Sequence, residues 1–270
     1  MSSTIRACIF DLGGTIVDRY SATPFFSLKR AFLKNKIKIS DRVILKDMGM
    51  SKSEHIGKIL CDNYVQRNWF QEYGKFPDPL DSDMIYEDFK KEQNKESKVI
   101  NIIPETKECF EYLKRRDIKI GITTGFDKEN MDLILSRMED EGLYVDSAVS
   151  STCLLRSRPY PDMINKLKED FKIENNYQII KFDDTSIGIK EANNGDFWSV
   201  GVTKWSTLMG IVEPEDIMGE GLMSSDEYRK RLIKARETLI ECNADFVIHD
   251  LTEINDVFRE VYRSILYDHF

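Results

Sequence analysis

Short apolar runs, each closed by a polar turn, recur along the chain and restrict its fold most strongly. The first run, Arg6 to Phe10, is followed by Asp11 and by a turn that contains Gly13 and Gly14. A buried strand that ends in a carboxylate explains this pattern better than a helix does. Similar strand-like runs begin at Ile118, Tyr177, Trp198 and Asp245. Helix-like segments lie between them, at 105–116, 128–141, 161–171 and 188–194. This alternation predicts an α/β fold, with a parallel sheet that has helices on both faces.

The segment from residue 21 to residue 98 interrupts the alternation. It contains amphipathic, helix-like stretches at 25–35, 53–72 and 83–96, and it has no strong strand signal. We therefore expect a helical domain over residues 21–98, inserted into a core domain made of residues 1–20 and 99–270.

Charge and cysteine content limit the classes of partner and the compartment. The formal net charge of −8 argues against nucleic acid as a partner, because a phosphate backbone requires clustered Lys and Arg. Five cysteines without a C-x-x-C pair favour a reducing compartment. No stretch approaches the ~18 apolar residues that span a bilayer, and the first residues lack a signal-peptide layout. We expect a cytoplasmic protein with a small-molecule substrate, no nucleic-acid partner and no membrane partner.

Four polar residues are expected where ligands bind in such a sheet, beyond the carboxyl ends of the strands. They are Asp11, Thr124, Arg158 and Asp184. A single Asp at a strand end is more often a turn residue or a helix cap. The order and spacing of the four are more specific than any one of them.

These residues and their neighbours resemble the four motifs of the haloacid dehalogenase (HAD) superfamily. Residues 10–15 (F-D-L-G-G-T) resemble D-x-D-G-T, and residues 122–125 (I-T-T-G) resemble the second motif. Arg158, in S-R-P-Y-P, resembles the third-motif cation, and residues 183–185 (D-D-T) resemble the fourth motif, G-D-T. The resemblance implies a Rossmann-like HAD core and identifies the inserted helical domain as a cap.

The resemblance also implies roles for these residues. Asp11 is the nucleophile that attacks phosphorus. Thr124 and Gly125 bind phosphoryl oxygen, with Thr123 as the alternative to Thr124, and Arg158 offsets the charge of the transferring group. Asp11, the backbone carbonyl of Gly13 and Asp184 hold Mg²⁺. The chemistry agrees, because a carboxylate that attacks a phosphorus dianion needs cations beside it, and oxygen ligands suit Mg²⁺.

Gly13 stands where phosphatases of the superfamily carry a second Asp, the general acid that protonates the leaving oxygen. Residues 47–56 (D-M-G-M-S-K-S-E-H-I) suggest why, because they resemble the cap segment of the phosphonoacetaldehyde hydrolase (phosphonatase) family. In that family a Lys at position 52 forms a Schiff base with the substrate aldehyde, and the acid position is non-acidic. Family members form homodimers, and here an apolar cap face could serve as the interface or pack inside the cap. Val65, Trp69 and Phe70 form that face.

A Schiff base and a missing acid belong together chemically. Cleavage of a C–P bond expels a carbanion, and an iminium group on the neighbouring carbon accepts its electron pair as an enamine. Lys52 must be neutral to attack the aldehyde, which requires a lowered pKa. His55 lies on the same helical face and could relay the proton, or it could be structural. Met48 could shape the pocket or simply pack.

Gly188 is a second departure from the motifs of the superfamily. The fourth motif usually continues G-D-x-x-x-D, and Gly188 stands where that motif has its last Asp. Asp183 replaces the usual glycine of that motif. Neighbouring side chains of a strand point to opposite faces, so we do not expect Asp183 to compensate fully. The leading hypothesis is hydrolysis of phosphonoacetaldehyde to acetaldehyde and phosphate. The alternatives are a phosphatase of another small organophosphate and a diverged protein with weak or no activity.

Overall fold

A single six-stranded parallel sheet forms the centre of the protein, in a computed structural model that describes residues 5–213, 216–217 and 223–267. The strand order is β3-β2-β1-β4-β5-β6. The strands are β1 (Ala7–Phe10), β2 (Lys119–Thr124), β3 (Ser147–Ser150), β4 (Ile179–Asp183), β5 (Trp198–Val202) and β6 (Phe246–Ile248). Every adjacent pair is parallel, which confirms the predicted α/β class.

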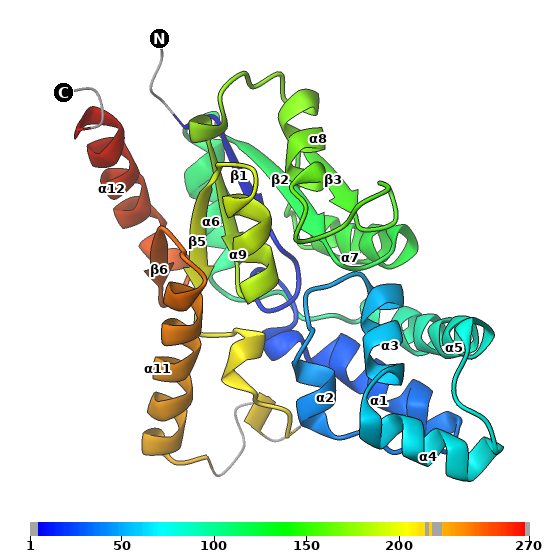
Figure 1. The fold of residues 1–270 in the computed structure, drawn as a ribbon. Helices are drawn as coiled ribbons and strands as arrows, with labels where there is room; N and C mark the ends of the chain where they lie inside the picture. Colours follow the sequence, from blue (N-terminus) through cyan, green and yellow to red (C-terminus); the bar gives the residue numbers. More distant parts are fainter. Residues whose placement is uncertain (1–4, 214–215, 218–222, 268–270) are drawn as a thin grey trace.

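Helices cover both faces of the sheet (Figure 1). They are α6 (Thr106–Lys114), α7 (Lys128–Asp140), α8 (Asp162–Asp170), α9 (Ser186–Asn193), α11 (Ser225–Glu241) and α12 (Ile254–Tyr267). Side chains of β1 alternate between two apolar clusters. Cys8 and Phe10 pack with α6, α7 and α12, whereas Ala7 and Ile9 pack with α8 and α9. Because both faces of β1 are buried, the strand reads as a continuous apolar run in the sequence.

Five helices lie between β1 and α6, in the segment predicted to be an inserted helical cap, and Figure 1 shows them gathered at one end of the sheet. They are α1 (Ala22–Lys34), α2 (Asp41–Leu45), α3 (Lys52–Leu60), α4 (Asn63–Tyr73) and α5 (Pro79–Ser97). These helices enclose a separate apolar cluster. Val65 and Trp69 are fully buried in it, so of the apolar face suggested for a dimer only Phe70 is substantially exposed, at 48%.

The described residues also form short 3₁₀ turns. They lie at Arg19–Ser21, Asn176–Gln178, Thr207–Met209 and Leu251–Glu253. Within the described residues, none of the helices is both long and apolar enough to cross a membrane.

Candidate active site

Asp11 lies at the carboxyl edge of the sheet, directly after the central strand β1. Its side chain is 8% exposed, and its Oδ1 lies 2.9 Å from Nη2 of Arg158. Burial raises the pKa of the Asp11 carboxyl, and the positive charge of Arg158 opposes that rise. The ion pair therefore favours the ionised form that a nucleophile requires.

Three buried carboxylates meet at this edge. Oxygen atoms of Asp11, Asp183 and Asp184 lie within 4.8 Å of one another. Asp184 is held by the hydroxyl of Thr15, which donates at 3.3 Å, and by the backbone N–H of Thr207, which donates at 2.7 Å. Burial and the adjacent acids raise the pKa of Asp184 well above its usual range. An oxygen-only donor set of this kind fits a divalent metal ion, which would offset the gathered negative charge.

The position of Asp183 corrects an expectation drawn from strand geometry. Because β4 ends at Asp183 and the chain bends at Asp184, the alternation of strand side chains no longer separates the two. Both carboxylates therefore reach the same cluster as Asp11. The Oδ1 atom of Asp183 accepts hydrogen bonds from the backbone N–H and the hydroxyl of Thr185, at 2.9 and 2.7 Å.

Buried charged residues that we did not predict form a network of ion pairs with these acids. Lys181 of β4 and Glu191 of α9 are both fully buried. The Nε of Arg158 donates to Glu191 at 2.9 Å, and the Nζ of Lys181 lies 3.1 Å from Asp183. One signal in the sequence was available, namely a lysine inside the apolar run I-I-K-F. A fully buried lysine needs an acidic partner.

The two threonines of the second motif have different surroundings. The hydroxyl of Thr123 accepts from Arg158 at 3.0 Å and from Lys181 at 2.9 Å, so it belongs to the charge network. Thr124 instead lines a small cavity beside Asp11, as does Gly125. This favours Thr124 over Thr123 as the residue that contacts a ligand.

That cavity joins the core to the cap. Its volume is about 20 Å³, which is space for about one water molecule. Its walls are Asp11, Gly13, Ser21, Pro24, Met48, Gly49, Lys52, Thr124, Gly125, Phe126 and Thr185. At one side the cap touches the core very closely, because a Cβ atom at Gly125 would lie 2.6 Å from the carbonyl oxygen of Met50. The structure is therefore a closed form in which the predicted nucleophile and the predicted amine share one cavity.

Lys52 begins α3 and is only 4% exposed. Its Nζ lies 3.4 Å from the carbonyl oxygen of Met50 and 6.0 Å from the centre of the Phe126 ring. Burial lowers the pKa of Lys52 to about 8, Asp11 opposes this shift, and Arg158 adds to it. The neutral amine is therefore accessible near neutral pH.

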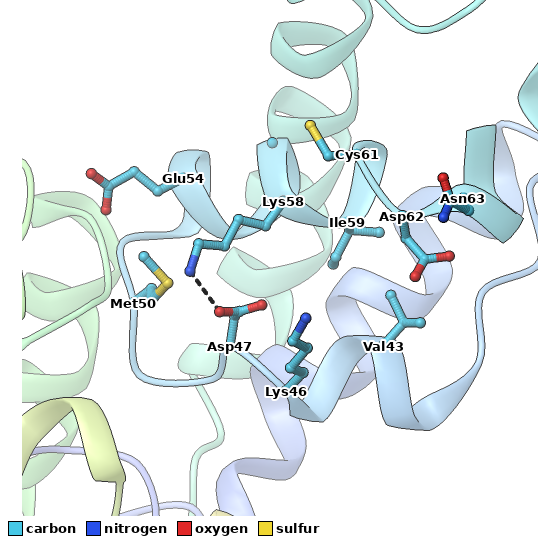
Figure 2. Close-up of a pocket in the computed structure, with 11 residues that line it drawn as sticks. Val43, Lys46, Asp47, Met50, Glu54, Lys58, Ile59, Cys61, Asp62 and Asn63 are labelled. Atoms are coloured by element: carbon cyan, nitrogen blue, oxygen red, sulfur yellow. Dashed lines mark hydrogen bonds and ion pairs between the residues drawn. The ribbon is translucent and has the colours of Figure 1, made fainter.

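A larger hollow lies on the outer side of the same helix. It has a volume of about 760 Å³. Figure 2 shows the side chains that line it. Lys58 and Asp47 form an ion pair of 2.7 Å on its wall. Neither Asp11 nor Lys52 lines it, so its size does not make it the reaction site. It shows instead how differently two lysines of one helix are placed.

Four of the predicted site residues have less direct support. His55 is fully buried but does not line the cavity, and burial together with Lys52 lowers its pKa to about 3. Arg158 reaches Asp11 from behind and is not on the cavity wall. Met48 is on the wall, as expected of a residue that shapes a pocket. Gly13 is there too, and the coordination of a metal by its carbonyl stays a prediction.

Comparison with known proteins places this geometry in a family context. The model of the haloacid dehalogenase-like hydrolases matches residues 8–202. A phosphonoacetaldehyde hydrolase of Latilactobacillus sakei is 32% identical, with 93% of each chain covered. One of Paraburkholderia xenovorans is 30% identical, with 95% of each chain covered. The crystal structure of a phosphonoacetaldehyde hydrolase-like protein from Oleispira antarctica superposes with a TM-score of 0.90 at 29% identity, covering 96% of this chain and 93% of that one.

Proposed function

Because the chain belongs to the haloacid dehalogenase-like hydrolases, and among them to the phosphonoacetaldehyde hydrolase family, we propose that it hydrolyses phosphonoacetaldehyde to acetaldehyde and phosphate. One observation carries the proposal. A carboxylate from the core, Asp11, and a buried amine from the cap, Lys52, line the same small cavity. The proposed cleavage uses both groups, the carboxylate at phosphorus and the amine at the aldehyde carbon.

In the first step the neutral amine of Lys52 attacks the aldehyde carbon. Loss of water then gives an iminium ion, and the lowered pKa of Lys52 makes the attacking form available. The aldehyde does not fit in a cavity that holds about one water molecule, so the cap must open to admit it. Closure around the bound substrate then limits the water left at the site, which favours the condensation. Met48, on the cavity wall, shapes the space around the bound aldehyde.

In the second step a carboxylate oxygen of Asp11 attacks phosphorus and the C–P bond breaks. The electron pair of that bond moves to the iminium group and gives an enamine, so no acid at position 13 is needed. Thr124 and Gly125 hold the phosphonate oxygens, and Arg158 balances the charge of Asp11. Mg²⁺, when held by Asp11, Asp184 and the carbonyl of Gly13, supplies further positive charge at this edge.

Two hydrolyses complete the cycle. Water cleaves the aspartyl phosphate and releases phosphate, so Asp11 is regenerated. The enamine takes a proton on carbon, and hydrolysis of the resulting iminium releases acetaldehyde and the amine of Lys52. One water is consumed overall. His55 is the candidate for the proton relay, although its low pKa makes it a weak base.

Borohydride reduction in the presence of phosphonoacetaldehyde tests the proposal. It should fix a two-carbon adduct on Lys52, visible as a mass shift of the peptide that contains it. The Lys52→Arg variant keeps a cation but forms no imine, so it should lose both the adduct and the release of acetaldehyde. Turnover that survives in this variant would overturn the proposal. A panel of phosphate monoesters, assayed beside the phosphonate, tests the alternative of an ordinary phosphatase.

The family resemblance further favours a homodimer in the cytoplasm. Light scattering coupled to size-exclusion chromatography measures the mass in solution and tests the dimer directly.

A further inference from the structure

The carboxyl group of Asp183 occupies the space that a side chain at position 188 would need, beside the cluster of acids. Gly188 lies in the first turn of α9, and its backbone N–H donates to the hydroxyl of Thr185 at 3.2 Å. A Cβ atom built on Gly188 would lie 1.9 Å from Cγ of Asp183, and 2.0 and 2.2 Å from its two oxygens. No side chain can occupy position 188 while the Asp183 carboxyl keeps this place.

The carboxyl of Asp183 is also held in this place by charge. Its Oδ2 atom lies 3.1 Å from Nζ of Lys181 and 3.5 Å from Nη1 of Arg158. That oxygen is fully buried, and within the described part of the chain it accepts no hydrogen bond of good geometry. It therefore retains bonding capacity beside Asp11 and Asp184.

We propose that the acid and the glycine of the fourth motif have exchanged places in this chain. Asp183, at the end of the strand, supplies the carboxylate that the metal site otherwise takes from position 188. Gly188 is then not a lost acid, because its missing side chain is what admits the Asp183 carboxyl. This proposal depends on the proposed function in one respect, namely that the cluster of Asp11, Asp183 and Asp184 binds Mg²⁺. The same metal site is thereby built from the strand instead of from the helix.

The exchange makes a specific prediction about pairs of substitutions. Asp183→Gly removes the carboxylate and should weaken Mg²⁺ binding about 10- to 100-fold, the usual effect of losing a supporting ligand. Gly188→Asp alone places a side chain in occupied space and should lower the melting temperature. The double variant Asp183→Gly/Gly188→Asp should fold and bind Mg²⁺ within about threefold of the original chain, since it restores a compatible arrangement.

Isothermal titration calorimetry with MgCl₂, on full-length protein freed of metal by a chelator, measures these affinities without any substrate. Asp183→Asn, which keeps the shape of the side chain, covers the case in which a glycine variant fails to fold. Glu191→Gln is the matched control, because it removes an equal charge from the same network but no oxygen from the metal cluster.

The expected result is a large loss of affinity for Asp183→Asn, a small one for Glu191→Gln, and recovery in the double variant. Wild-type affinity in Asp183→Asn, equal losses in Asp183→Asn and Glu191→Gln, or a double variant no better than Asp183→Gly would overturn the exchange. The Mg²⁺ affinities of Asp183→Asn, Glu191→Gln and the double variant are measured without the phosphonate. They therefore test the exchange even if the protein does not cleave a C–P bond.

Discussion

The reactivity of Lys52 toward an aldehyde should follow a titration curve whose midpoint lies near pH 8. Burial lowers the pKa of this amine from 10.5 to about 8. At pH 7 such an amine is ~9% neutral, whereas an ordinary lysine is ~0.03% neutral, so burial raises the reactive fraction about 300-fold. Below the midpoint, the rate of adduct formation should fall about tenfold for each pH unit.

The Asp11→Asn variant sharpens this test. It cannot form an aspartyl phosphate, so borohydride trapping in this variant reports imine formation alone. The negative charge of Asp11 raises the pKa of Lys52, and its removal should therefore move the midpoint to lower pH. Trapping at pH 7 should then be faster than in the original chain, although turnover is lost.

Peptide mass spectrometry of the trapped protein supplies an internal control. Lys58 belongs to the same helix but is half exposed and paired with Asp47 at 2.7 Å, and we expect it to stay unlabelled. Equal labelling of Lys52 and Lys58, a midpoint near pH 10, or a midpoint that Asp11→Asn leaves unmoved would refute the reasoning.

Three further predictions concern cap closure, acid stability and the metal. Gly125→Ala should lower kcat/KM at least about tenfold, because the added Cβ would force the cap loop away from the core. Gly57→Ala is the control, because a Cβ there would have no atom within 4 Å. That variant should keep its activity and gain up to ~1 kcal/mol of helix stability. His55 has a folded pKa of about 3, below its unfolded 6.5, so the unfolded state binds more protons between these values and stability falls as pH drops. Denaturant unfolding should show that the free energy of unfolding at pH 5 is about 2 kcal/mol lower than near neutral pH because of this residue. The His55→Leu variant should not show this decrease, whereas a variant at the exposed His249 should still show it. An unchanged pH dependence in His55→Leu would contradict the assignment. A chelator should abolish acetaldehyde release but leave borohydride trapping at Lys52, and turnover that persists without metal would contradict the metal's place at the phosphoryl step.

Much of the core could be read from apolar runs alone. The strand at Trp198–Val202 begins at the predicted residue, because its apolar run is buried and follows a turn. Strand β3 (Ser147–Ser150) was missed because S-A-V-S is too short and too polar to stand out. The amphipathic stretch at 53–72 is helical as expected, but the pattern did not show that it divides into α3 and α4. The division lies at Asp62, whose carboxylate caps α4 by accepting hydrogen bonds from the backbone N–H groups of Tyr64 and Val65.

The site was predictable where a motif carried it and not where contacts between distant residues decide it. Motif spacing brought Asp11 and Asp184 to one edge, because parallel strands end together. It could not show that β4 ends between Asp183 and Asp184, which turns two consecutive acids toward one point. Nor could it show Lys181 and Glu191 meeting inside the protein, since their proximity depends on how α9 packs against the sheet.

The central position of β1 has a consequence for how the chain is made. Ala7 pairs with Lys119 on one side and with Ile179 on the other, so β1 leaves the ribosome well before either of the strands that it pairs with. The cap helices emerge in between and have an apolar cluster of their own to bury. During that interval β1 exposes two unpaired edges and an apolar surface, the features that favour aggregation. We therefore expect nascent chains that end before β4 to depend on chaperones, and complete chains to be released from them.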